Sequence, residues 1–209
     1  MSQHTKMRVR VKICGITRLE DARVAAQQGA DAVGLVFHPA SPRSIEPSIA
    51  ATIISALPAF VTSVALFRNP QPAMVDEVLE AAPFDLLQFH GAESPEFCAS
   101  FGRPFIKAVG ASPDLGDDLT RFHNARGVLI DHPGGGGTGQ VFDWALVPTR
   151  RPEGLIVAGG LTPANVAGAI RALRPYAVDV SSGVESAPGI KDASRIRSFI
   201  EEVNHVGGH

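Results

Sequence analysis

A cysteine ends the first apolar run of the chain, in the stretch VKICGIT, where a glycine follows it directly. This residue, Cys14, is either one more buried apolar side chain or a thiol that takes part in chemistry. An aspartate, Asp131, ends a later apolar run in the same way. Such an aspartate either caps a turn or, when it faces a pocket, works as an acid or base. If the two runs end close together, the chain carries a candidate acid/base pair.

Two short stretches rich in glycine and serine, AGGLTPAN and DVSSGVE, contain the ends of two later apolar runs. Backbone N–H groups in such turns, beside the start of a helix, bind phosphate, and glycine lets the backbone approach it closely. The same residues also suit simple tight turns. Because two such stretches follow consecutive runs, we predict a phosphate site there. Its residues are Gly159, Gly160, Ser181, Ser182 and Gly183.

Further polar residues follow other runs. Arg43, in SPRSI, carries a guanidinium that can pair with a carboxylate through two N–H groups, although most loop arginines are solvated. His38 and His90 are most simply read as structural histidines. The glycine-rich loop at 132–140 lacks the ending of a nucleotide-binding loop and is either a mobile cover or a plain connection. No His or Cys pair has the spacing of metal ligands, so we expect no metal.

Eight short runs rich in β-branched residues must position these side chains. They are mostly apolar rather than alternating, as in strands buried on both faces of a parallel sheet. The runs are residues 8–13, 31–37, 60–67, 85–89, 104–109, 127–130, 154–158 and 177–180. Their centres lie about 20–30 residues apart, the length of one strand and one helix with short loops.

Helix-like stretches lie between several of these runs, at residues 19–30, 72–82, 162–173 and 192–203. Gly29 stands where the first should end, and Thr162 and Asp192 are the expected N-caps of the last two. An open doubly wound sheet would show the same local pattern, but eight regular units favour a closed barrel. We therefore predict a single (β/α)8 TIM barrel of the phosphate-binding type over residues 1–209, with frayed ends at 1–7 and 205–209. Its active site would lie at the C-terminal ends of the strands.

Composition narrows the functional classes. The 209 residues are 44% hydrophobic, which is enough for a large core, and the formal net charge of −2 gives no basic surface for nucleic acid. No apolar run approaches the ~20 residues of a membrane helix, and the polar, basic start does not resemble a secretory signal. Cys14 and Cys98 lie far apart without CxxC spacing, so we expect free thiols and a cytoplasmic protein.

Seven motifs, taken together, resemble the phosphoribosylanthranilate isomerase family in their order and spacing. They are KICGIT, GLVFHPASPRSI, LFRNP, LLQFHG, LIDHPGGGGTGQVFDW, VAGGLTPANV and VDVSSGVESAPGIKD. The resemblance extends from about Val11 to the final predicted helix. The combination of KICG with SSGVE and PGIKD makes it specific, and it favours a chemical role for Cys14.

The resemblance implies an isomerase of tryptophan biosynthesis that works without a cofactor. The reaction is the Amadori rearrangement of N-(5′-phosphoribosyl)anthranilate to 1-(o-carboxyphenylamino)-1-deoxyribulose 5-phosphate. The family's general base falls on Cys14, its general acid on Asp131 and its ligand for the anthranilate carboxylate on Arg43. The phosphate falls on the backbone of the two glycine- and serine-containing turns.

This chemistry requires a Cys14 thiol that ionises more readily than a free thiol, with its pKa of about 8.5, and an Asp131 that keeps its proton. Lys12 lies on the same predicted strand as Cys14, but we expect it to point to the opposite face. The sequence therefore offers no group that stabilises the thiolate.

Three more residues are candidates for substrate contact, namely Gln88, His90 and Asp179, although the last is equally explained as an ordinary strand-end aspartate. The chain departs from the family pattern at two positions and in one loop, which gains His132, Pro133 and an additional glycine. Gln140 replaces a basic residue that many relatives have, and Phe89 replaces a smaller aliphatic residue. These changes concern the loop and the pocket shape rather than the reaction.

Two other functions remain open at this point. An isomerase of the histidine pathway performs the same chemistry on an aminoaldose phosphate. Bifunctional barrels usually employ a pair of aspartates, however, whereas this chain has Cys14 at the position on the first strand. A non-catalytic phosphosugar-binding barrel would lose the acid or the base, yet both are present. We expect a small phosphorylated substrate, neither nucleic acid nor membrane as partner, and a monomer rather than a homodimer.

Overall fold

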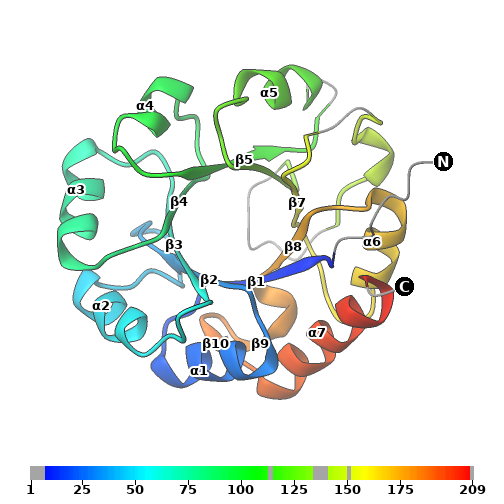
Figure 1. The fold of residues 1–209 in the computed structure, drawn as a ribbon, viewed down its shortest axis with the longest axis horizontal. Helices are drawn as coiled ribbons and strands as arrows, with labels where there is room; N and C mark the ends of the chain where they lie inside the picture. The colour runs from blue at the N-terminus through cyan, green and yellow to red at the C-terminus, as the bar shows by residue number, and fades with distance from the viewer. Residues whose placement is uncertain (1–7, 113–114, 134–140, 150–151, 208–209) are drawn as a thin grey trace.

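The computed structural model describes residues 8–112, 115–133, 141–149 and 152–207, and they form a closed barrel of eight strands (Figure 1). Each strand pairs in parallel with its neighbours in sequence, and β8 pairs with β1 to close the ring. The strands are β1 (Arg10–Cys14), β2 (Ala32–Val36), β3 (Thr62–Phe67), β4 (Leu86–Phe89), β5 (Phe105–Gly110), β6 (Gly127–Asp131), β7 (Leu155–Val157) and β8 (Ala177–Val180). The predicted (β/α)8 architecture is confirmed, and each of the eight apolar runs overlaps one strand, although β1, β5 and β6 extend one residue beyond their runs.

In the described residues, seven α-helices form an outer ring around the barrel (Figure 1). They are α1 (Leu19–Gln28), α2 (Pro47–Ser55), α3 (Pro72–Ala81), α4 (Pro95–Ala99), α5 (Leu115–Arg121), α6 (Val166–Leu173) and α7 (Ala193–Gly207). The C-terminal α7 packs between α6 and α1, so the first and last helices close the ring. In the described part of the chain, no helix is both long and apolar enough to cross a membrane.

The strands are apolar on both faces because two separate cores use them. Along β5, Phe105 and Val109 belong to the large core between barrel and helices, whereas Ile106 and Ala108 belong to a smaller cluster with Leu129 of β6. Alternate residues of a strand point to opposite faces, so the smaller cluster fills the barrel interior. The polar residues at the strand ends therefore rest on a packed floor.

The ends of two helices agree with the predicted signals. Gly29 follows α1 with φ 98°, in the left-handed region that glycine adopts without strain. Before α7, a carboxylate oxygen of Asp192 accepts hydrogen bonds from the N–H groups of Ser194 at 2.8 Å and Arg195 at 3.0 Å. Asp192 is therefore the N-cap, as predicted.

The start of α6 differs from the prediction, which placed the N-cap at Thr162. The helix begins at Val166, because the side chain of Asn165 closes the preceding residues into a turn. Its amide oxygen accepts from the Thr162 N–H at 2.8 Å, and its NH₂ group donates to the carbonyl of Gly160 at 2.9 Å. This turn fixes the backbone after β7, where the phosphate site is predicted.

The other end of the predicted domain also needs a correction. Residues 205–207, expected to be frayed, continue the last helix, and Val203 and Phe199 anchor its preceding turns in the core. Residues 1–7 and 208–209 lie outside the described part of the chain. A small hairpin of β9 (Glu185–Ala187) and β10 (Ile190–Lys191), which was not predicted from the sequence, follows the 3-10 helix η2 (Ser182–Val184).

Candidate active site

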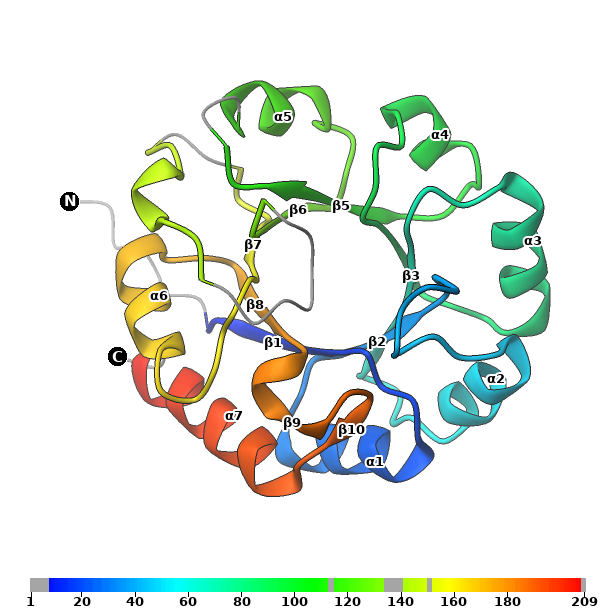
Figure 2. The ribbon, with the colours of Figure 1, turned by 180° about the vertical axis from the view of Figure 1, so that it is seen from behind.

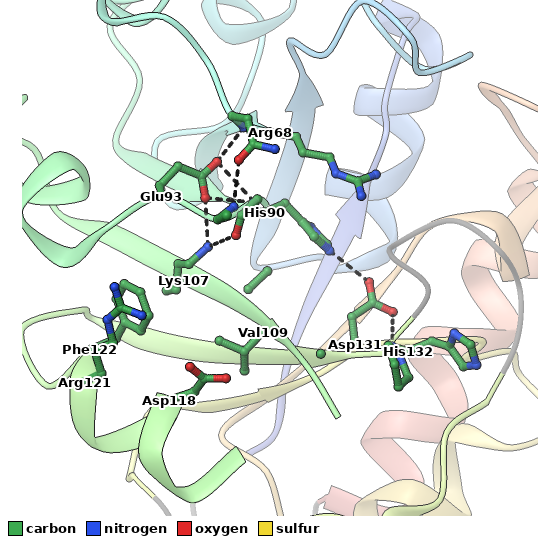
Figure 3. Close-up of a pocket in the computed structure, with 16 residues that line it drawn as sticks. Arg68, His90, Glu93, Lys107, Val109, Asp118, Arg121, Phe122, Asp131 and His132 are labelled. Atoms are coloured by element: carbon green, nitrogen blue, oxygen red, sulfur yellow. Dashed lines mark hydrogen bonds and ion pairs between the residues drawn. The ribbon is translucent and has the colours of Figure 1, made fainter. Parts of the chain in front are cut away.

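The C-terminal ends of the strands enclose a cavity of about 100 Å³ at the barrel mouth. Cys14 from β1 and Asp131 from β6 both line it, so the two residues predicted to meet do share one cavity. Other predicted site residues along its wall are Arg43, Gln88, His90, Asp179 and Ser181. A second cavity of about 460 Å³ lies beside it and shares Arg68, His90 and Asp131 (Figure 3).

Cys14 lies almost entirely out of solvent, against Val36 and Leu66. Burial raises the pKa of its thiol, since a thiolate loses its hydration there, while the nearby Lys12 ammonium acts in the opposite direction. Burial outweighs the ammonium, so the pKa of the Cys14 thiol is raised above its usual value. A base at this position therefore needs a positive charge beside it when it reacts.

Lys12 supplies one such charge, and the prediction that it points away from Cys14 is wrong. Residues two apart on a strand share a face, and Val11 and Ile13 of β1 occupy the outer core, so Lys12 and Cys14 face the interior. A Cβ placed on Gly34 would lie 2.8 Å from the Cys14 sulfur and 2.9 Å from the Lys12 nitrogen. The two atoms are therefore within about 6 Å of each other.

Asp179, at the end of β8, holds the Lys12 ammonium. Its carboxylate accepts a hydrogen bond from Lys12 Nζ at 2.9 Å, and both side chains are buried. Although burial alone would lower it, this carboxylate holds the pKa of Lys12 well above its usual value. The ammonium thus stays charged next to Cys14. The strand's two-residue period was the signal that could have identified Lys12.

Asp131 is oriented by two contacts, shown in Figure 3. One carboxylate oxygen accepts from the N–H of His132 at 2.7 Å, and the other lies 3.3 Å from His90 Nε2. On its far side, His90 Nδ1 lies 3.4 Å from the amide nitrogen of Gln88. If that amide donates, Nδ1 is the acceptor and Nε2 carries the hydrogen that points to Asp131. The carboxyl group is thereby held at the cavity wall.

Gln88 is fully buried, and its amide oxygen has no hydrogen-bond partner among the described residues. Buried polar atoms are nearly always paired, so an unpaired one that lines a cavity indicates a position where a bound molecule donates. Gln88 and His90, both predicted as substrate contacts, line this cavity.

Arg43 lies in the loop after β2, and its stem crosses the backbone of Gly15. A Cβ on Gly15, whose φ is 72°, would lie 2.5 Å from Arg43 Cδ, so this approach requires glycine. The guanidinium forms a two-bond pair with Glu185, with both distances 2.8 Å. Arg43 was predicted from the sequence, whereas its partner Glu185 was not.

The two predicted phosphate turns pack directly on each other. A Cβ on Gly183 would lie only 1.9 Å from the carbonyl oxygen of Leu161, so no side chain fits between them. Gly159 and Gly160 have φ of 78° and 61°, again in the left-handed region. Of the five predicted phosphate residues, only Ser181 lines the cavity itself.

Two further observations complete the site. Among the described residues, no group of three or more His, Cys, Asp or Glu side chains is arranged to hold a metal ion. Gln140 and most of its glycine-rich loop, 134–140, lie outside the described part of the chain, whereas Phe89 stacks on Phe67 in the outer core. The departure at Phe89 therefore concerns packing behind the strands.

Comparison with known proteins gives consistent matches along nearly the whole chain. The family model of N-(5′-phosphoribosyl)anthranilate (PRA) isomerase matches residues 11–202. The N-(5′-phosphoribosyl)anthranilate isomerase of Pseudomonas fluorescens (strain SBW25) is 51% identical over 205 residues, which cover 96% of this chain and 98% of the relative.

Solved structures agree with this match. A phosphoribosyl anthranilate isomerase in complex with reduced 1-(o-carboxyphenylamino)-1-deoxyribulose 5-phosphate has a TM-score of 0.84 and 42% identity, covering 94% of this chain and 99% of that one. A second structure shows monomers generated from the dimeric enzyme of Thermotoga maritima, with a TM-score of 0.84, 40% identity and the same coverage.

Proposed function

The chain belongs to the N-(5′-phosphoribosyl)anthranilate isomerase family, and from this premise we propose that Cys14 is the general base and Asp131 the general acid of the reaction. It is an isomerase of tryptophan biosynthesis, and its substrate is a small phosphorylated molecule. One observation carries the assignment of roles. A thiol from β1 and a carboxyl group from β6 line the same cavity at the barrel mouth, with Arg43 beside them.

The reaction begins with ring opening. Asp131 in its protonated form gives its proton to the ring oxygen of the ribose, the bond between this oxygen and C1 breaks, and a protonated Schiff base forms at C1. The contacts of Asp131 with His90 and the His132 N–H orient its carboxyl group for this transfer. Both side chains line the cavity.

The second step removes the proton from C2. Cys14 as thiolate takes this proton, the electron pair moves toward the cationic nitrogen, and the resulting enolamine tautomerises to the ketone. The Schiff base adds a positive charge beside the sulfur at this stage, and Lys12 adds another from below. Both charges favour the thiolate, against the burial that disfavours it.

The substrate itself is the electron sink, so we propose that the reaction needs no cofactor. Arg43 binds the carboxylate on the aromatic ring, and Gln88 offers its free amide oxygen to a substrate hydroxyl. The phosphate binds to backbone N–H groups of the two packed turns, at Gly160 and Gly183. Asp179 fixes Lys12 rather than serving only as a contact to the ribose.

The decay of phosphoribosylanthranilate fluorescence tests these roles. Cys14→Ser and Asp131→Asn are each expected to lower turnover by at least ~100-fold while still binding a product analogue. Cys98→Ser, which changes a buried cysteine in α4, is the matched control and should retain activity. If Cys14→Ser turns over at nearly the wild-type rate, Cys14 only packs, and the base is another residue.

A wild-type chain that is inert with this substrate would contradict the whole assignment. The aminoaldose phosphate of the histidine pathway is then the next substrate to assay, because its isomerisation uses the same chemistry. Retained phosphate binding without either activity would indicate the non-catalytic barrel instead.

We also propose that the enzyme acts in the cytoplasm as a single-domain monomer. Both cysteines are free, as is usual in a reducing compartment, and the described chain builds one closed barrel. Phe60 is 97% exposed, but a single exposed apolar side chain is common on monomers. The T. maritima relative is dimeric, so sedimentation of wild type and Phe60→Asp is the test. A wild-type dimer would overturn the monomer, and its dissociation by Phe60→Asp would place the interface at Phe60.

A further inference from the structure

The side chains of Arg43, Glu185 and Lys191 form a buried charged cluster beside the cavity. Two of them, Glu185 and Lys191, have no role in the catalytic steps proposed above. Glu185, the first residue of β9, accepts from Arg43 Nε and Nη2 at 2.8 Å each and from Lys191 Nζ at 2.8 Å. The side chain of Lys191 is 0% exposed, and those of Glu185 and Arg43 are 5% and 12% exposed. Burial of three charges costs free energy unless the charges pair at short hydrogen-bond distances, and the 2.8 Å contacts of this cluster meet that condition.

The cluster connects three separate parts of the site. Figure 2 shows the β9–β10 hairpin beside α1, next to the end of β1. The backbone N–H of Lys191 donates to a carboxylate oxygen of Asp21 in α1 at 3.1 Å and secures the hairpin there. Lys191 Nζ also donates to the carbonyl of Ser181 at 3.1 Å. Glu185 thus links the arginine after β2 to the turn after β8 that contains the phosphate residues.

The pairing leaves part of the guanidinium free. Of the five N–H donors of an arginine, Glu185 takes one on Nε and one on Nη2, so the edge formed by Nη1 and Nη2 stays available for a second carboxylate. The stem is fixed as well, because it lies across Gly15. Arg43 is therefore held in one orientation before any ligand binds.

The charges of the cluster also favour an anion. Arg43 and Lys191 are cations and Glu185 is the one carboxylate between them, so the cluster keeps one net positive charge. Burial acts to raise the pKa of Glu185, but the two cations outweigh it and hold that pKa below its usual value. A ligand carboxylate at the free edge of Arg43 would neutralise the cluster.

We propose that Glu185, itself held by Lys191, is a positioning residue that orients Arg43 and makes the enzyme selective for substrates with a carboxylate on the aromatic ring. The inference rests on the proposed role of Arg43 as the carboxylate ligand. It adds that selectivity depends on a carboxylate that does not touch the substrate. Preorganisation of this kind lowers the cost of ordering the arginine when the ligand binds.

Isothermal titration calorimetry with two ligands tests this. One is reduced 1-(o-carboxyphenylamino)-1-deoxyribulose 5-phosphate, and the other is the same compound without its carboxylate. Glu185→Gln is expected to weaken binding of the first at least about tenfold and of the second less than about twofold, since one orienting charge pair is lost. In steady-state assays the variant should raise KM for the carboxylated substrate much more than it lowers kcat.

Glu93→Gln is the matched control. Glu93 also pairs with a buried lysine, Lys107, at 2.8 Å, but on the far side of the neighbouring cavity from Asp131 (Figure 3). Glu93→Gln should leave the ratio of the affinities for the ligands with and without the carboxylate at the wild-type value. If Glu185→Gln fails to fold, Glu185→Gln with Lys191→Met removes one charge of each sign and keeps the net positive charge. The double variant should show the same loss of selectivity.

The outcomes separate this inference from the function it rests on. If Arg43→Met keeps the preference for the carboxylated ligand, the role of Arg43 fails, and this inference fails with it. If Arg43→Met loses the preference and Glu185→Gln keeps it, only the inference fails. If Glu185→Gln loses affinity for both ligands equally, Glu185 merely supports the fold, and this result also overturns the proposal.

Discussion

Replacement of Lys12 by methionine should raise the pKa of the Cys14 thiol. The ammonium and the sulfur lie within about 6 Å of each other, where two unit charges interact by roughly 3 kcal/mol at an effective dielectric constant of about 20. This energy corresponds to about two pKa units. Loss of Lys12 also leaves the Asp179 carboxylate without its partner, which raises the thiol pKa further.

The rate of iodoacetamide alkylation as a function of pH measures this pKa, because the thiolate is the reactive form. Burial raises the pKa of Cys98 to about 12, and a Cys98→Ala background removes its signal entirely. Lys12→Met should shift the alkylation midpoint of Cys14 upward by about two units. The activity near neutral pH should fall in parallel and recover partly in alkaline buffer.

Lys12→Met with Asp179→Asn is the control variant, since it removes both members of the buried pair. Breaking such a pair from one side alone destabilises a protein, whereas removing both partners leaves no buried charge unpaired. The midpoint of the double variant should lie between those of wild type and Lys12→Met. A midpoint in Lys12→Met within about half a unit of wild type would refute the argument that this charge acts on Cys14.

Three other predictions concern the phosphate turns, the acid and the stability. Gly183→Ala should weaken inhibition by inorganic phosphate at least about tenfold, because the new methyl group clashes with the carbonyl oxygen of Leu161. Gly116→Ala is the control and should leave this inhibition unchanged, because the space around Gly116 is open. His90→Asn should lower kcat roughly tenfold with little change in KM in steady-state assays, since it removes a contact that orients the acid; an unchanged kcat would contradict this role. Burial acts to raise the pKa of Glu93, but Lys107 outweighs it and holds that pKa below its usual value of about 4.3. The stability this carboxylate contributes is therefore present above that value and lost as the pH falls through the lower folded-state pKa. Calorimetric melting temperatures of wild type should fall more steeply below pH ~4 than those of Glu93→Gln, and parallel curves would refute the linkage.

Much of the fold could be predicted from the sequence, because parallel strands that are buried on both faces have continuous apolar sequences. All eight strands lie where such runs were found. The start of α6 was misplaced, because the turn before it depends on the side chain of Asn165, which a propensity argument does not resolve. The β9–β10 hairpin was missed because its strands are short and only partly apolar.

The site was predicted in part, and the misses have separate causes. Cys14 and Asp131 stood out because each ends an apolar run. Lys12 was assigned to the wrong face, although the two-residue period of a strand places it with Cys14. The partner of Arg43 could not be found this way, since Glu185 lies 142 residues further along the chain and only the closed barrel brings the two together.

The division of labour between Cys14 and Asp131 is tested most directly by the primary isotope effect with substrate deuterated at C2. In Cys14→Ser the removal of this proton should become the slow step, so the isotope effect should increase over wild type. In Asp131→Asn ring opening should become the slow step, so the effect should fall to unity. The reverse pattern, or no effect in Cys14→Ser, would contradict the assignment of Cys14 as the base that takes the C2 proton.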